Sequence, residues 1–340
     1  MKAVILAGGE GTRLHPLTYT RPKSLIPILD RPMVNYTLDY FREGVDEIIF
    51  AAGHMVAELR SYIDAIGEGS RVKIVTEENP LGTGGAVKNV ESLLDEPFIV
   101  LNADIISSIN MQEFISFAEE KGGMGSIALF PSSHPEDYGV VELEEGQRIV
   151  RFVEKPPRKE AFSNLINAGV YYLKPEILDL MEPNKFVSME REVFPLIIDD
   201  GFFGYRFDGH WVDVGKVDTY LEAVRTILDI RGSRIDEASQ IGDGVEVINP
   251  VYVGPQSVKM SGRLGPFASI GNGCDLGTSE ITGSVLFDNV RLGENVGVTD
   301  SVLGEGVVVG DNSTLKGCVV GDGEVIEEGS NLVDKKVGMR

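Results

Sequence analysis

The stretch Lys2-Ala-Val-Ile-Leu-Ala7-Gly-Gly-Glu-Gly-Thr-Arg13-Leu opens the chain, and Lys23 follows ten residues after Arg13. The apolar run over Lys2–Ala7 predicts a buried strand. The glycines after it allow the backbone to approach a ligand closely, while Arg13 and Lys23 supply fixed positive charge. We therefore predict a site for a polyanion, such as a nucleoside triphosphate, at the carboxyl end of the first strand.

Two common glycine-rich motifs do not fit this stretch. A dinucleotide-binding fingerprint needs a third glycine where Leu14 stands, and a Walker loop needs Gly-Lys-Ser/Thr where Gly11 is followed by Thr12-Arg13. A surface turn with scattered cations stays open as an alternative for so short a motif taken alone.

Composition limits the partners and the compartment. The 340 residues carry a net charge of −22, which opposes binding to nucleic acid or to anionic lipid. No apolar run is long enough to span a membrane, so we expect a cytoplasmic protein without a membrane partner. Cys274 and Cys318 form no metal-binding pattern, and we expect both to be small core residues.

Residues 1–230 alternate β-branched runs with helical stretches, which predicts an α/β catalytic domain with a Rossmann-like, parallel or mixed sheet. The predicted strands after the first are Glu47–Ala52, Val72–Thr76, Phe98–Asn102, Gly125–Phe130 and Ala168–Leu173, and the predicted helices are Met33–Glu43 and Asp218–Asp229.

Residues 235–334 repeat an apolar residue every five or six positions, from Ile235 through Ile281 and Phe287 to Leu332, which is typical of a left-handed parallel β-helix. The five- or six-residue spacing is interrupted between Val253 and Leu264, where we expect a loop or an imperfect coil. All four histidines precede residue 235, so a structural coil is favoured over an acyltransferase. Such coils expose strand edges, and we expect a homo-oligomer formed through this domain.

Two aspartates follow apolar runs far apart in the chain. Asp104 ends Phe98-Ile-Val-Leu-Asn-Ala, and Asp213 ends His210-Trp-Val. Taken alone, each is better explained as a turn residue at the end of a strand or as a helix cap. In a phosphate-binding protein the pair would form a Mg²⁺ site, because Mg²⁺ takes one or two carboxylates, phosphate oxygens and water.

The whole string from Leu6 to Ile28 closely resembles the signature of the nucleotide-sugar pyrophosphorylases. The segments Pro80-Leu-Gly-Thr-Gly-Gly-Ala, Ser188–Pro195 and Trp211-Val-Asp-Val-Gly resemble most the mannose-1-phosphate guanylyltransferase branch, whose members also carry a C-terminal hexapeptide coil. The resemblance implies transfer of a nucleotidyl group from an NTP to a sugar 1-phosphate, with release of pyrophosphate. It also implies that Asp104 and Asp213 hold the Mg²⁺ cofactor.

The resemblance further implies a sugar phosphate site. Glu154 would contact sugar hydroxyls and Lys155 the phosphate, while Gly139, Asn167 and Gly169 would lie around the ring. An exposed charged strand end is the alternative for Glu154-Lys155, and an amide bonded to its own backbone is the alternative for Asn167.

Base selection is predicted in the segment that begins Glu77-Glu78. A carboxylate only accepts hydrogen bonds, and guanine offers two donors on its Watson–Crick edge, so GTP is favoured. A solvated Glu-Glu pair stays open as an alternative. The complete predicted nucleotide set is Leu6, Ala7, Gly8, Gly9, Gly11, Thr12, Arg13, Glu77, Gly82 and Thr83.

A sugar phosphate is largely dianionic at neutral pH, its second pKa being about 6, so it can attack the α-phosphorus without a general base. The predicted catalytic residues, Arg13, Lys23, Asp104 and Asp213, are accordingly charge partners, and Lys23 also contacts substrate. A glucose-1-phosphate thymidylyl-, uridylyl- or adenylyltransferase and a non-catalytic regulatory subunit that binds nucleotide sugars are the competing interpretations.

Overall fold

The computed structural model describes residues 1–338 and divides the chain into two compact units. The first unit comprises residues 1–10 and 36–211, and the second comprises residues 11–35 and those from 212 onward. The signature loop and the helix before the coil thus group with the coil, whereas the sequence placed the domain boundary near residue 230.

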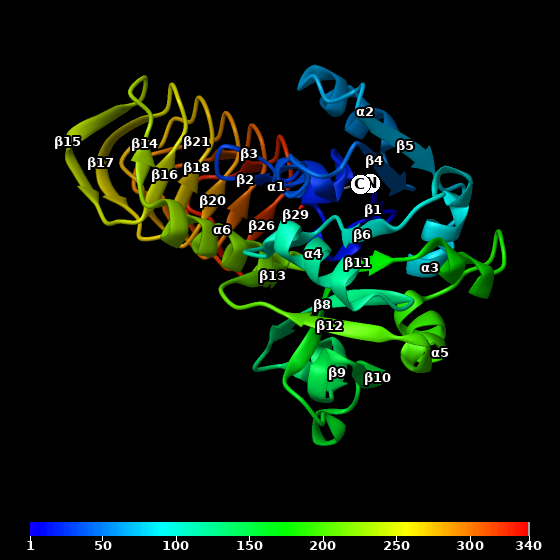
Figure 1. The fold of residues 1–340 in the computed structure, drawn as a ribbon. Helices are drawn as coiled ribbons and strands as arrows, with labels where there is room; N and C mark the ends of the chain where they lie inside the picture. The colour runs from blue at the N-terminus through cyan, green and yellow to red at the C-terminus, as the bar shows by residue number, and fades with distance from the viewer. Residues whose placement is uncertain (339–340) are drawn as a thin grey trace. The chain divides into compact units, whose positions relative to one another are not determined.

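The first unit is built on a mixed sheet with the strand order β10-β9-β11-β6-β1-β4-β5, and β8 and β12 extend it beside β11 (Figure 1). β1, β4, β5 and β6 pair in parallel, while β11 runs antiparallel to β6. The predicted Rossmann-like α/β fold is confirmed. The strands are β1 (Lys2–Ala7), β4 (Glu47–Ala52), β5 (Val72–Thr76), β6 (Phe98–Asn102), β7 (Ile105–Ser107), β8 (Gly125–Pro131), β9 (Gly139–Leu143), β10 (Ile149–Glu154), β11 (Leu165–Leu173) and β12 (Phe202–Arg206).

Helices cover this sheet and provide its core. Val4 and Ile49 pack on α3 (Gly82–Asn89) and α5 (Phe194–Ile197) in one buried cluster. The other helices are α1 (Met33–Asp39), α2 (Val56–Ala65) and α4 (Met111–Lys121). α1 ends four residues earlier than predicted, because the chain turns toward Gly44, whose φ of +76° is a glycine conformation.

The second unit contains the parallel β-helix, confirmed as three sheets of short parallel strands (Figure 1). Its first sheet is β14 (Arg234–Ile235), β16 (Val251–Val253), β18 (Ala268–Ile270), β20 (Val285–Leu286), β23 (Val302–Leu303), β26 (Val319–Val320) and β29 (Lys336–Val337). Its second sheet is β15 (Gln240–Val247), β17 (Val258–Leu264), β19 (Glu280–Thr282), β22 (Gly297–Thr299), β25 (Thr314–Lys316) and β28 (Asn331–Val333). Its third sheet is β21 (Arg291–Leu292), β24 (Val308–Val309) and β27 (Val325–Ile326).

Two details of the repeat differ from the sequence expectation. The stretch between Val253 and Leu264 holds the strand β17, paired with β15; within it the buried Lys259 donates a hydrogen bond from Nζ to the Ser279 carbonyl oxygen (2.6 Å). Lys259 thus occupies a position where the six-residue repeat would place an apolar side chain. Burial lowers the pKa of its ammonium group to about 8. Leu286, and not the predicted Phe287, belongs to the coil core.

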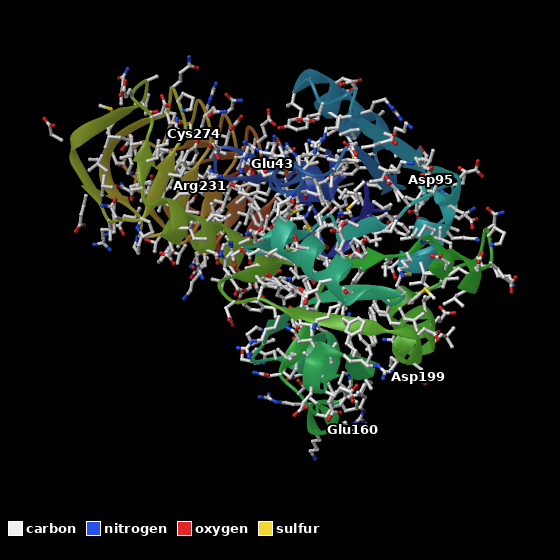
Figure 2. All side chains as sticks on the ribbon, in the orientation of Figure 1. Glu43, Asp95, Glu160, Asp199, Arg231 and Cys274 are labelled. Carbon is white, nitrogen blue, oxygen red and sulfur yellow. The ribbon has the colours of Figure 1, made fainter. Side chains whose placement is uncertain are left out.

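The second unit also includes the hairpin β2 (Pro27–Ile28) and β3 (Arg31–Pro32), the last residues of β13 (Trp211–Asp213), and α6 (Val217–Arg231). Tyr220 of α6 donates a hydrogen bond to the Pro27 carbonyl oxygen (2.6 Å). Cys274, labelled in Figure 2, and Cys318 are buried thiols in the coil core, as expected. Among residues 1–338, the helices lack the length and apolar character needed to cross a membrane.

The coil core predicts a specific stability effect. Leu303 is fully buried, so Leu303→Ala should lower the free energy of unfolding by about 2–5 kcal/mol through lost burial and a residual cavity. Val325→Ala is the matched control, because Val325 is 67% exposed, and its effect should stay within about 0.5 kcal/mol. Urea denaturation followed by circular dichroism measures both, and equal effects would contradict the assignment of Leu303 to the core.

Candidate active site

A pocket of about 350 Å³ opens in the first unit at the carboxyl end of β1. Its lining comes from the glycine-rich turn, the start of α3 and the end of β6. The lining residues are Leu6, Gly8, Gly9, Glu77, Pro80, Leu81, Gly82, Thr83, Ala86, Asn102, Asp104 and Phe186. Six of the predicted nucleotide-binding residues therefore lie around one cavity.

Glu77 is the buried charge of this pocket. Its Oε2 accepts a hydrogen bond from the Leu81 backbone N–H (3.4 Å), and its Oε1 is buried with no hydrogen-bond donor among residues 1–338. Burial raises the pKa of this carboxyl. A Cβ at Gly8 would lie 3.1 Å from the Glu77 carboxylate oxygens, so a side chain there would crowd the carboxylate. Glu78 is exposed, and the structure thus separates the two glutamates that the sequence left equivalent.

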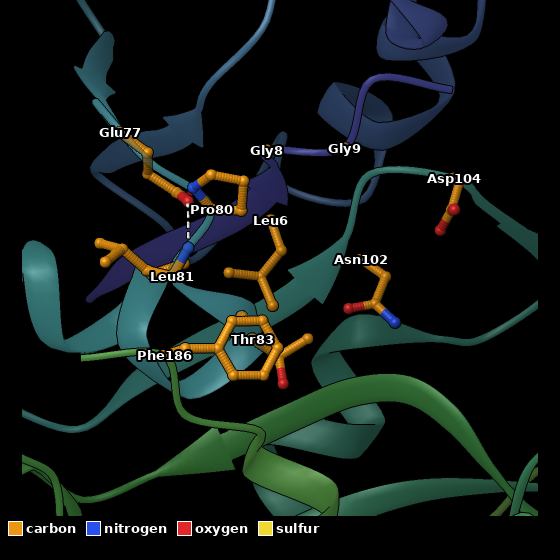
Figure 3. A pocket seen from close by; sticks show the side chains of 12 residues that line it. Leu6, Gly8, Gly9, Glu77, Pro80, Leu81, Thr83, Asn102, Asp104 and Phe186 are labelled. Atoms are coloured by element: carbon orange, nitrogen blue, oxygen red, sulfur yellow. Dashed lines mark hydrogen bonds between the residues drawn. The ribbon is translucent and has the colours of Figure 1, made fainter. Parts of the chain in front are cut away.

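Asp104 lies at the other side of the pocket. Figure 3 shows Glu77 and Asp104 on opposite sides of the Leu6 side chain, with Asn102 near Asp104. Asn102 ends β6, and a Cβ at Gly169 would come within 2.8 Å of the Asn102 Nδ2 atom. Gly169 has a φ of +74°, so both conformation and space require glycine there.

Thr83 connects the pocket to a polar network. Its hydroxyl donates to Glu190 Oε2 (2.7 Å), and Tyr171 donates to Glu190 Oε1 (3.2 Å). Asn167 in turn donates from Nδ2 to the Tyr171 hydroxyl oxygen (2.9 Å) and accepts from the Gly169 backbone N–H (2.8 Å). The Asn167 amide therefore bonds its own backbone, which was the alternative left open for it.

Glu154 lies beside this network. It pairs in register with Gly139 on β9, and a Cβ at Gly139 would lie 2.8 Å from the Glu154 Oε2 atom. Burial raises the pKa of Glu154, and the charge of Glu190 adds to the effect. Lys155 follows with Nζ 3.9 Å from Glu154 Oε1. The predicted sugar-site residues thus come from adjoining strands, β9, β10 and β11, of the same unit.

The second unit gathers three of the four predicted catalytic residues. A Cβ at Gly215 would lie 3.1 Å from Arg13 Nη2 and 3.2 Å from Asp213 Oδ1, so both groups border one point. Gly11, with a φ of +68°, would bring a Cβ within 3.3 Å of Lys23 Cβ. Thr18 closes the turn by donating from its hydroxyl to the Gly11 carbonyl oxygen (3.0 Å).

Several functional candidates escaped the sequence prediction. Asn102 could have been found, because it stands at the end of the same apolar strand as Asp104. Glu190 lies within a segment that carried the family resemblance but had no role assigned to it. Phe186 gave no signal: its 68% exposed side chain belongs to no periodic element, yet it lines the pocket.

Known proteins are similar to this chain in sequence and in fold. Residues 2–230 match the nucleotidyl transferase family, and residues 262–336 match the GlmU-like C-terminal hexapeptide family. A mannose-1-phosphate guanylyltransferase 1 of Arabidopsis thaliana is 36% identical, over 81% of this chain and 77% of its own. A UTP–glucose-1-phosphate uridylyltransferase of Synechocystis sp. is 31% identical, over 86% and 84%. The solved structure of HddC from Yersinia pseudotuberculosis, complexed with GMP-PN, is similar with a TM-score of 0.57 and 26% identity, over 66% of this chain and 99% of that one.

The raised pKa of Glu77 predicts a pH-dependent cost in stability. A carboxyl whose pKa is higher in the folded than in the unfolded state favours folding below the unfolded pKa, and this contribution is lost as the pH rises through the folded pKa. Glu77→Gln removes the buried charge, so its stability relative to the parent should increase with pH from about pH 4 upward. Urea denaturation between pH 4 and 8 measures this, with Glu78→Gln as the control. A difference that does not change with pH would contradict the assigned burial of charge.

Proposed function

The chain belongs to the nucleotidyl transferase family, and from this membership we propose that it transfers a guanylyl group from GTP to mannose 1-phosphate, giving GDP-mannose and pyrophosphate. Its named relatives share the activity of a sugar-1-phosphate nucleotidyltransferase. The identity of the base and the identity of the sugar are what we propose here. Glu77 lines the pocket, and its buried Oε1 has no hydrogen-bond donor among residues 1–338; this observation supports the choice of base.

Guanine fits Glu77 by hydrogen-bond chemistry. An ionised carboxylate is an acceptor only, and the guanine N1–H and exocyclic amine are two adjacent donors. Uracil and thymine present one N–H between two carbonyl oxygens, so they would place an acceptor against the carboxylate. Gly8 and Gly82 leave the backbone free of side chains beside this carboxylate, and Leu81 adds an apolar wall.

The sugar phosphate is assigned to the strands next to the pocket. Glu154 would accept hydrogen bonds from sugar hydroxyls, and Lys155 would contact the phosphate. The polar network from Thr83 through Glu190 to Tyr171 and Asn167 supports both halves of this site. Mannose is proposed because the Arabidopsis relative is named for it.

The donor chemistry of two carboxylates suits a divalent metal. Asp104 lines the pocket and Asp213 borders the Arg13 guanidinium, and two carboxylates with substrate phosphate oxygens and water are a donor set that Mg²⁺ accepts. Asp104 and Asp213 would hold the ion. When bound, it would neutralise phosphate charge.

The reaction needs alignment and charge stabilisation more than proton transfer. The dianionic sugar phosphate attacks the α-phosphorus, the α–β bridging bond breaks, and pyrophosphate leaves with the bonding electrons. Lys155 would orient the attacking phosphate, Lys23 the α-phosphate, and Arg13 would take up charge on the departing β- and γ-phosphates. No histidine or cysteine is required for this sequence of events.

The coil is assigned to assembly. Hexapeptide repeats favour oligomers, and β27, β28 and β29 are the edge strands of their sheets after the last turn. We propose a homo-oligomer formed through the β-helix.

The charge partners predict large losses of turnover. Arg13→Ala, Lys23→Ala and Asp104→Asn should each lower kcat at least ~100-fold, because each removes one preorganised charge at the reacting phosphates. The assay is pyrophosphate release with Mg²⁺, for every NTP against a panel of sugar 1-phosphates. Arg60→Ala, an exposed arginine on α2, is the control and should keep full turnover. Near-normal turnover of folded Arg13→Ala would overturn its role, and no release with any pair would favour a regulatory binding subunit.

Base choice predicts a second, separable effect. Glu77→Gln replaces one acceptor by a donor, so kcat/KM for GTP should fall roughly 10- to 100-fold while that for UTP or dTTP falls less. Binding of guanine favours the ionised carboxylate, so the affinity of the parent for GTP should weaken as the pH falls below the raised pKa of Glu77.

Calorimetric titration with GTP across pH 4.5–8 measures this dependence. The glutamine variant should lose it, while Glu78→Gln should retain both the GTP preference and the pH dependence. Equal effects of the two substitutions would show that Glu77 does not read the base.

A further inference from the structure

The segment that carries Arg13 and Lys23 is fastened to the coil by a cluster outside the pocket. Arg21 pairs through Nη2 with Asp322 Oδ2 (2.6 Å) and with Glu305 Oε2 (3.1 Å), and the Thr20 hydroxyl donates to the same Asp322 oxygen (2.5 Å). We call residues 11–26 the cation loop. All of these groups belong to the second unit.

On the coil side of this cluster, a hydrogen bond joins two turns and an aromatic ring lies beside the arginine. Asp322 Oδ1 accepts the backbone N–H of Glu305 (2.7 Å), which ties together two successive turns of the coil. The Arg21 guanidinium lies 5.3 Å from the centre of the Phe287 ring. Phe287, outside the coil core, is only 2% exposed, so it is an outward aromatic residue that is covered. Burial alone would lower the pKa of Arg21, but Asp322 and Glu305 outweigh it and the net shift is upward.

Two further contacts hold the same loop. Lys336 donates from Nζ to the backbone carbonyl oxygen of Arg13 (3.1 Å). Pro16 packs where Cβ atoms at Gly321 and Gly338 would approach its ring to 3.2 and 2.8 Å. The coil therefore contacts the cation loop at Arg13, at Pro16 and at Thr20–Arg21.

We propose that Arg21 is a positioning residue, and that its ion pairs with Asp322 and Glu305 hold the cation loop on the last turns of the β-helix so that Arg13 and Lys23 are preorganised for the triphosphate. Arg21 itself touches no substrate in this account. The inference rests on the proposed roles of Arg13 and Lys23, and it gives the coil a part in nucleotide binding besides assembly.

Charge repulsion explains why such a fastening matters. Arg13 and Lys23 lie in one short loop, and like charges held near each other repel when no polyanion is bound. A loop that relaxed between turnovers would have to be reordered by each incoming NTP, at the expense of affinity. Paired carboxylates on a rigid coil oppose that relaxation.

The test compares Arg21→Ala, Asp322→Asn and the double variant with Arg225→Ala. Arg225 is the matched control, because it forms an ion pair of the same length with Asp300 of the coil (2.6 Å) but does not touch the cation loop. Hydrogen–deuterium exchange of peptides over residues 11–26 reads the loop directly, and steady-state kinetics gives KM for the NTP and for the sugar phosphate separately.

Arg21→Ala and Asp322→Asn should each speed exchange in the cation loop and raise KM for the NTP by roughly 10-fold, with KM for the sugar phosphate changed little. The double variant should lose less than the sum of the two single losses, because both substitutions remove the Arg21–Asp322 pair. Arg21→Lys should recover part of the NTP affinity. Arg225→Ala should leave both readouts unchanged, and thermal melting confirms that all variants fold.

Unchanged loop exchange in Arg21→Ala would overturn the proposal, as would faster exchange with an unchanged KM for the NTP. Equal rises of KM for both substrates would also overturn it, because they would indicate general destabilisation. If the parent protein released no pyrophosphate with any substrate pair, the proposed function would fail, while the exchange data would still decide whether Arg21 fastens the loop.

Discussion

A protein of strongly negative charge that binds a triphosphate must neutralise the charge of this substrate locally. With a net charge of −22, the surrounding field repels the substrate, so attraction must come from a few cations held at fixed places. In the proposed site, Arg13 and Lys23 would meet this requirement, and the turn at Gly11 brings them into one loop. Asp213 lies beside the Arg13 guanidinium, and its negative charge offsets part of the positive charge there.

The part of the pocket assigned to the base also contains a group that lowers stability, the buried carboxyl of Glu77. Burying Glu77 with an acceptor unused disfavours its charged form, and the hydrogen bond that its carboxylate accepts from the Leu81 N–H is long, at 3.4 Å. A group that lowers stability is retained when a ligand uses it, and two guanine donors would satisfy the oxygens that the protein leaves open. At Gly8, beside Glu77, a side chain would crowd this carboxylate.

Local pattern predicted a large part of this molecule. The strands β1, β4, β5 and β6 were placed to the residue, because continuous apolar runs bounded by polar residues have one buried interpretation in a parallel sheet. The coil was predicted because one aliphatic residue per rung leaves a periodic trace. Sequence failed where a contact joins distant residues: Glu190 meets Thr83 across 107 positions, and no local pattern encodes that bond. The prediction of Phe287 as a core residue was wrong by one position. Spacings of five and six residues both occur in the repeat, so Leu286 suited the core equally well.

The grouping of residues 11–35 with the coil changes how the two sequence blocks relate. By pattern alone the chain divides into a catalytic α/β part and a structural repeat, and the signature loop belongs to the first. In space the loop lies with the repeat, 301 positions away along the chain at the Arg21–Asp322 pair. A coil that served assembly alone would need no outward phenylalanine under an arginine and no carboxylate tied to two of its own turns. These features bury surface that water could otherwise solvate. They contact the cation loop, the segment whose cations must be held in place. On our proposal, the repeat is the support that holds the cation loop in place.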